Sequence, residues 1–391
     1  MLAQVAINAA MAGVRLALPL QALQSGRTAW SVGLLLALFT LLPVLTAMPT
    51  GRLTDRRGYH RPLQLAVALT VAGSLLALLA VYLPGDWQFA VMCLSAAACG
   101  SGANVCGIAT QRTGGKLARN AHERLRYFSW LGMAPAVAAG IGPVLIGVVI
   151  DRAGYGWAYA LMATLPLIAL LAMRVLPRQA KTLPDASSTS RRGRLSELLA
   201  VPGLPRLLFV NWLLSASWDV HSFAVPLLGH ARQFSASTIG MVLGVFTLAV
   251  ALVRLVIPLL AHRINEVKLL RGAMLVSALI LLVYPYASSP WQMTLSAALL
   301  GLALGAVQPT VVSMLYMLSP PDRQGEVMAF RSMAISVSNS AMPLVFGLVG
   351  SLLGPAVMFW MMGAVVGAGS WAARGLKAQQ PAGPVQRSDD A

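Results

Sequence analysis

The chain has 391 residues, of which 57% are hydrophobic and only 10% are charged, and its mean hydropathy is +0.72. An ordinary soluble domain carries about 25% charged residues, so this composition argues against a water-soluble protein. The formal net charge of +17 would suit a nucleic-acid-binding protein, but the positions of the basic residues, described below, argue against nucleic acid as a partner.

Apolar runs of about 20 residues follow one another along the chain, and this is the length of a helix that crosses a bilayer. The first run contains Arg15 and lacks a basic leader and a small-residue cleavage site, so we expect a retained span and not a signal peptide. We predict an all-α integral membrane protein with twelve transmembrane helices. The runs lie at residues 2–23, 30–50, 63–83, 88–109, 130–150, 157–176, 207–229, 237–260, 269–287, 291–316, 328–350 and 355–374.

The basic residues are distributed asymmetrically over the loops between these runs. If both ends of the chain are cytoplasmic and the spans alternate, the cytoplasmic segments hold 24 of the 29 Lys and Arg residues, and the outer loops hold three. Basic residues are enriched in cytoplasmic loops, close to anionic lipid headgroups. We therefore predict an inner (plasma) membrane protein with cytoplasmic N- and C-termini, whose basic residues contact membrane lipid.

A polar segment rich in Ser and Pro, residues 177–206, divides the chain near its middle and is typical of a flexible cytoplasmic linker. It separates a predicted N-terminal six-helix bundle, residues 1–176, from a predicted C-terminal six-helix bundle, residues 207–374. Residues 375–391 are predicted to form a disordered cytoplasmic tail.

The two predicted bundles share a weak internal repeat. A shift of 207 residues places Gly33 on Gly240, and a shift of 200 residues places Pro143 on Pro343 and Gly147 on Gly347. Parallel repeats related by an axis along the membrane normal are found in transporters, where the substrate site lies between the two repeats.

The loop after the second run reads GRLTDRRGYHRPL, residues 51–63. It closely resembles the loop 2–3 signature of the major facilitator superfamily, and a decayed copy, PLLAHRINEVKLL, follows at residues 258–270. The resemblance implies that this cluster holds the two bundles together on the cytoplasmic side while the cavity is open to the outside. Its residues suit that gating role, because a glycine allows close helix approach and an acid can accept N–H groups at a helix start. The signature positions are Gly51, Asp55, Arg56, Gly58 and Arg61.

A second resemblance lies in the fifth run, where AVAAGIGPVLIG is similar to the Gly-Pro motif of the superfamily's antiporter branch. Gly142, Pro143 and Gly147 occupy its positions, and Ala138 replaces its first glycine. The arginine that this family carries in the fourth span has no counterpart here.

Ionisable side chains inside a span are energetically costly and mark candidate functional residues. Asp219 is the acid that lies well inside a span, so we predict that it carries a proton, with a structural ion pair to Arg15 as the alternative. His221 is a second proton-carrying candidate or a hydrogen-bonded structural histidine. Arg254, near the inner end of its span, is expected to reach the lipid interface or to join helices.

Polar side chains recur at helical spacing around these groups, as in the series Asn211, Ser215 and Asp219. The resemblance implies that the first helix of each three-helix unit lines the cavity. For Gln308 an interhelical hydrogen bond is the alternative to a role in substrate binding. The predicted substrate-cavity residues are Asn8, Arg15, Asn104, Asn211, Ser215, Trp218 and Gln308.

These features together predict a secondary active transporter that works by alternating access and exports a small molecule, a drug or a metabolite, by proton antiport. The alternatives are proton symport of a small, anionic metabolite and a non-transporting receptor built on a transporter fold. The sequence has no phosphate-cradling loop, nucleophile set or metal-ligand cluster. We therefore expect neither an enzyme nor a bound metal or other cofactor. We also expect a monomer.

Overall fold

The structure is a computed structural model, and it describes residues 2–57, 59–117, 121–170, 203–260, 265–318 and 324–373. The described residues are almost entirely helical. In the first part of the chain the helices are α1 (Leu2–Gln24), α2 (Ala29–Arg57), α3 (His60–Ala80), α4 (Gly85–Leu117) and α5 (Ala121–Thr164). In the second part they are α8 (Leu204–Ala231), α9 (Ala236–Leu260), α10 (Glu266–Val283), the 3₁₀ turn η2 (Tyr284–Tyr286), α11 (Pro290–Gly305), α12 (Val307–Leu318), α13 (Gln324–Leu353) and α14 (Pro355–Ala372).

Local sequence explains where several helices begin and end. Ser289 and Gln292 form a capping box in front of α11, and Pro290 occupies its first turn, where a missing N–H costs nothing. Asn265 caps α10 by accepting the backbone N–H of Lys268 at 3.1 Å. Within α5, Gly154 has φ +80° and ends the regular helix at the predicted turn between the fifth and sixth apolar runs.

Helices cover at least part of every predicted apolar run. In the described chain, eight helical segments are long and apolar enough to cross a membrane, and one of them, Ala134–Leu170, covers two predicted runs. Two shorter apolar helices, Ala29–Pro43 and Pro355–Trp371, coincide with two more runs. The prediction of an all-α membrane protein is confirmed, and the count of twelve spans stays a prediction.

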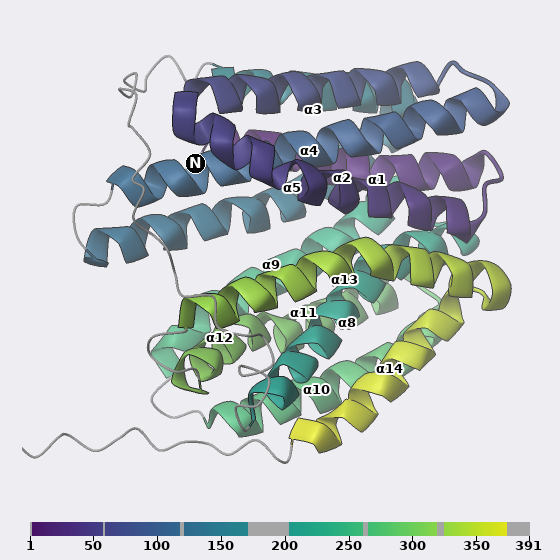
Figure 1. The fold of residues 1–391 in the computed structure, drawn as a ribbon. Coiled ribbons are helices and arrows are strands. Elements are labelled where there is room, and N and C mark those ends of the chain that lie inside the picture. The colour runs from purple at the N-terminus through teal and green to yellow at the C-terminus, as the bar shows by residue number, and fades with distance from the viewer. Residues whose placement is uncertain are drawn as a thin grey trace, which may run out of the picture.

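The helices form two bundles, α1–α5 and α8–α14, which lie one above the other in Figure 1. In the first bundle α1 packs on α5 and α3 on α4, and in the second α14 packs on both α8 and α10. The bundles meet chiefly where α5 crosses α9 and where α2 crosses α13. Residues 171–202, which include most of the predicted linker, are outside the described chain.

The repeated glycines lie at these two crossings. A Cβ atom added to Gly33 of α2 would overlap the carbonyl oxygen of Pro343 in α13, and one added to Gly240 of α9 would overlap that of Pro143 in α5. Gly147 and Gly347 also lie against α9 and α2, where an added Cβ would be 2.5 and 3.0 Å from the nearest backbone oxygen. The pairs found by the sequence shifts therefore build two related contacts between the bundles, because only glycine lets two helix backbones come this close.

Candidate functional site

A cavity of about 240 Å³ lies between the two bundles and contains most of the charged side chains described at membrane depth. Helix α1 supplies one wall, and α8, α9, α11, α12 and α13 supply the others. Charged and polar groups inside a membrane protein are costly and mark its functional region. The lining residues are Arg15, Leu214, Ser215, Trp218, Asp219, Arg254, Leu304, Val307, Gln308, Ile335 and Asn339.

Asp219 faces this cavity from α8, at the position predicted from the polar series on that helix. Asn339 of α13 holds it: when the Asn339 amide is oriented to satisfy both partners, it donates to the Asp219 carboxylate at 3.0 Å and to the carbonyl of Ile335 at 3.2 Å. Arg15 of α1 faces the same cavity and interacts with Asp219 electrostatically. The two do not form a direct ion pair within 4.0 Å, as Arg27 and Asp86 do at 2.8 Å.

A smaller cavity of about 120 Å³ shares two wall residues, Arg15 and Trp218, with the first. Trp218 packs edge-on against Phe246 of α9, with ring centroids 4.7 Å apart. Ser222, three residues after Asp219 on α8, and Pro143 of the Gly-Pro motif also line this space, so α8 and the motif face each other here. The two cavities together run along α8 between the bundles.

Two further arginines belong to this region. Arg254 lines the cavity of about 240 Å³ directly, so in this structure it faces the interior and not the lipid interface, which was one of the two alternatives predicted for it. Arg331 of α13 donates a hydrogen bond to Oε1 of Gln308, which lines the same cavity. Sequence reasoning missed Arg331 because it lies in the first turn of the predicted run 328–350, where it was counted with the cytoplasmic basic residues. Its spacing of four and eight residues from Ile335 and Asn339 was the available signal, since that spacing places all three on one helix face.

The remaining predicted cavity residues lie outside the two cavities. Asn8 donates to the carbonyl of Gln4 on its own helix at 2.8 Å, and Asn104 of α4 donates to the carbonyl of Pro43 in α2 at 3.0 Å. Asn211 is buried two turns before Asp219 on α8, and its Oδ1 has no partner among the described residues. Asn104 therefore joins two helices of the first bundle in this structure.

His221 points away from the cavities into the second bundle. It is fully buried, its Nε2 lies 3.2 Å from the hydroxyl of Tyr284, and its ring stacks on Phe246 at 4.2 Å. Tyr284 in turn stacks on Phe359, with centroids 4.7 Å apart. This surrounding favours the structural alternative for His221 over proton transfer.

The structure describes the Gly-Pro motif in full and the loop 2–3 motif only in part. Gly142 packs against the backbone of Ala9 in α1, where an added Cβ would be 2.5 Å from the carbonyl oxygen. The Gly-Pro motif is therefore a packing element between helices. In the loop 2–3 cluster, Gly58 lies outside the described residues, and Gly51, Asp55 and Arg56 are described only as backbone at the end of α2. Arg61 is exposed at the start of α3.

Asp151 joins the bundles at the end of α5 that is predicted to face outward. Its carboxylate accepts the backbone N–H groups of Ala236 at 2.9 Å and of Ser237 at 2.7 Å, at the first residues of α9. A carboxylate at a helix N-terminus is stabilised by the helix dipole and by the free N–H groups. This contact between bundles was not predicted, because nothing in the sequence pairs residue 151 with residue 236.

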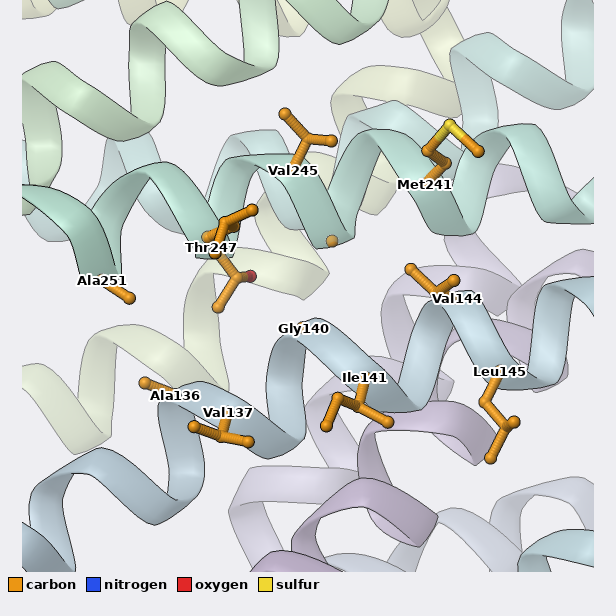
Figure 2. Close-up of a pocket in the computed structure, with 12 residues that line it drawn as sticks. Ala136, Val137, Gly140, Ile141, Val144, Leu145, Met241, Val245, Thr247 and Ala251 are labelled. Atoms are coloured by element: carbon orange, nitrogen blue, oxygen red, sulfur yellow. The ribbon is translucent and has the colours of Figure 1, made fainter.

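A larger groove of about 500 Å³ lies between α5 and α9 and is lined almost entirely by apolar side chains. Figure 2 shows Ile141 and Val144 on one side of it and Met241 and Val245 on the other. Ile141 and Met241 are about half exposed, so this groove borders the lipid in a membrane. Since it contains no charged group, we place the functional site in the smaller polar cavities.

Two helical bundles that enclose a cavity with a few charged side chains are an arrangement found in membrane transporters. The chain belongs to the Major Facilitator Superfamily, whose family model matches residues 1–205 and 207–389. It is a transporter and not an enzyme, and it crosses the membrane several times.

Relatives and solved structures agree with this family. The chain is 26% identical over 349 residues to the multidrug resistance protein MdtG of Salmonella paratyphi A, covering 86% of this chain and 82% of that protein. It is also 26% identical to the MdtG of Enterobacter lignolyticus, over 86% and 80% of the two chains. A POT family transporter in complex with 5-aminolevulinic acid has a TM-score of 0.71 at 13% identity, over 95% and 93%. A mutant of the nucleoside transporter NupG has a TM-score of 0.71 at 12% identity, over 96% and 99%.

Proposed function

We propose that this transporter exports a small molecule in exchange for protons, and that Asp219 carries the proton. One observation carries the proposal: of the acids whose side chains the structure describes, Asp219 is the one that lines the cavity between the bundles. A carboxylate in that place can bind a proton from one side of the membrane and release it to the other, since its charge becomes more or less costly as the cavity opens and closes.

The neighbours of Asp219 suit this role. Asn339 can donate to the ionised carboxylate, and Arg15 faces it from the opposite bundle without a direct ion pair. Because Arg15 belongs to α1 and Asp219 to α8, protonation of Asp219 changes the electrostatic attraction between the two bundles. The proton is thereby coupled to the separation of the bundles. We also propose that the predicted cluster around Asp55 acts as a gate and that the bundles have the predicted boundaries. The transporter is proposed to be a monomer with both termini in the cytoplasm.

Export is the proposed direction for two reasons. The curated relatives are called multidrug resistance proteins, and the Gly-Pro motif at residues 136–147 is similar to that of antiporters. Proton symport of an anionic metabolite is the second candidate. The arginines in the cavity favour it, because a proton and an anion would reduce each other's electrostatic cost there.

The test is transport by purified protein in proteoliposomes with an imposed pH gradient. The substrate is a compound found by a thermal-stability screen of drugs, organic acids, phosphonates and peptides, since a ligand of the native state raises its apparent stability. We expect Asp219→Asn to bind the compound and to lose gradient-driven accumulation. Asp86→Asn is the matched control, since Asp86 is a described acid that is exposed and far from the cavity. Full gradient-driven accumulation by Asp219→Asn would show that the proton takes another route.

A further inference from the structure

The charged groups of the cavity do not balance. Arg15 and Arg254 line it, and Arg331 contacts it through its hydrogen bond to Gln308. Among the described side chains that line the cavity, Asp219 carries the negative charge that opposes them. The cavity therefore has more positive than negative charge.

The other acids whose side chains the structure describes do not supply the missing charge. Asp86 pairs with Arg27, Asp151 caps α9, and Glu266 lies in the first turn of α10. Unbalanced charge at membrane depth costs several kcal/mol and is normally compensated by a partner. The described acids leave this positive charge without a full partner, so an anion that entered the cavity would be stabilised there.

Several buried hydrogen-bond donors in this region have no acceptor among the described residues. The Nε atoms of Arg254 and Arg331 are buried without an acceptor among the described residues, and so is the hydroxyl of Ser215. Asp219 is already engaged by the amide of Asn339. A buried donor without an acceptor costs roughly 1–3 kcal/mol, so a ligand whose oxygens accept from these groups would bind favourably. Guanidinium groups match the paired oxygens of carboxylates, phosphonates and phosphates.

We propose that the cavity binds the anionic group of its substrate, a carboxylate, phosphonate or phosphate, between Arg254 and Arg331, with Ser215 as a further donor. The rest of the substrate lies against Trp218 and Leu304, the aromatic and apolar part of the wall. A cavity of about 240 Å³ fits a small molecule. The inference rests on the proposed function in one respect, namely that this cavity is the transport site.

The experiment measures equilibrium binding to purified protein in nanodiscs made of uncharged lipid, so that lipid headgroups do not compete. The probes are inorganic phosphate, benzoate and phenylphosphonate, with benzamide and benzylammonium as neutral and cationic matches of similar size. We expect at least one of the three anions to bind and to raise thermal stability, and the neutral and cationic probes to do neither.

Three substitutions locate the site. Arg254→Gln and Arg331→Gln should each weaken anion binding by roughly tenfold or more, the effect of losing one charge-assisted hydrogen bond. Arg254→Lys keeps the charge and loses the paired donors of the guanidinium, so its anion affinity should lie between those of the wild type and Arg254→Gln. Such intermediate binding would show that the weak binding of Arg254→Gln does not come from misfolding. Arg27→Gln, which removes an arginine outside the cavity, should bind as wild type does.

The outcomes separate this inference from the proposed function, because binding is read without a gradient and proton coupling only with one. Anion binding that depends on Arg254 and Arg331, together with failure of gradient-driven transport, would keep the anion site and remove the proton-coupled exporter. Binding of benzylammonium but of no anion, or anion binding that is unchanged in both Gln variants, would overturn the anion site and leave proton coupling to be judged by its own test.

Discussion

The contact of Asp151 with the start of α9 predicts how the equilibrium between the two transport states can be shifted. The carboxylate accepts two backbone N–H groups from the other bundle, at 2.9 and 2.7 Å. Asp151→Asn replaces one acceptor oxygen with an NH₂ group that faces a donor. The state in which the outward ends of the bundles touch should therefore become less stable.

The size of the effect follows from the type of interaction. Removing a side-chain acceptor from a helix N-terminus costs about 1 kcal/mol, which corresponds to a roughly fivefold change in an equilibrium ratio. Because Asp151 is exposed, salt should reduce the part of the effect that comes from the helix dipole. We expect the ratio of molecules with separated outward ends to molecules with touching ends to rise about fivefold at low salt, and by less at high salt.

Distances between spin labels on the two bundles would measure this shift. Trp157→Cys and Trp291→Cys place labels at exposed positions, one in each bundle, after the native Cys93, Cys99 and Cys106 are replaced by serine. Asp86→Asn is the matched control, since it removes an acid whose contact stays within the first bundle. An unchanged distance distribution in Asp151→Asn, or an equal change in both variants, would refute the assignment of a contact that holds the outward ends together.

Three further outcomes are expected. Gly240→Ala should destabilise the protein or slow transport by forcing α9 away from Pro143, at a cost of roughly 1–3 kcal/mol, whereas Gly272→Ala, where an added Cβ meets nothing within 4 Å, should be neutral in unfolding and transport assays. Tyr284→Phe, which removes the hydroxyl next to His221, should lower the thermal unfolding temperature and leave the proton-to-substrate ratio unchanged; a changed ratio would place His221 in the proton path. Cysteines at Ser187, in the predicted linker, and at the exposed Ser288 should react with a membrane-impermeant reagent from opposite sides of the membrane, and reaction of both from outside intact cells would refute the predicted topology.

Periodicity along one helix was enough to predict part of the site. The spacing of Ser215 and Asp219 on α8 placed both on one face, and the structure has both in the wall of one cavity. The glycines at the bundle crossings could be predicted as well, because a shift of 207 residues aligns Gly33 with Gly240 in the sequence alone. Features of this kind depend on residues within one helix or on a comparison of the chain with itself.

Contacts between distant helices could not be predicted in the same way. The partner of Asp219 is Asn339, which lies 120 residues later in the chain, and the partner of Asp151 is the backbone of Ala236. Backbone N–H groups leave no trace in a sequence, and a hydrogen bond between α8 and α13 depends on how the two helices pack. Arg331 was missed for a different reason: it lies at the inner end of the predicted run 328–350, where a basic residue is expected from membrane topology alone.

The sign of the coupling between proton and anion decides which direction of transport the cavity supports. Two unit charges about 8 Å apart at an effective dielectric constant of 20 interact by about 2 kcal/mol, a roughly thirtyfold change in affinity. Neutralising Asp219 removes this repulsion, so electrostatics alone favours an anion and a proton that bind together, as in symport. In export by antiport, protonation must favour a conformation that does not bind the anion. It must favour that conformation by more than the repulsion that it removes. If the transporter is a proton-driven exporter, benzoate should therefore bind more weakly at pH 6 than at pH 8. Asp219→Asn should still bind it, at both pH values with the affinity that the wild type has at pH 6. Tighter binding by the wild type at pH 6 would assign symport. Arg15 and Arg254 face Asp219 in the cavity and keep their charge over this range, and His221 points away toward Tyr284, so the pH dependence would report the proton on Asp219.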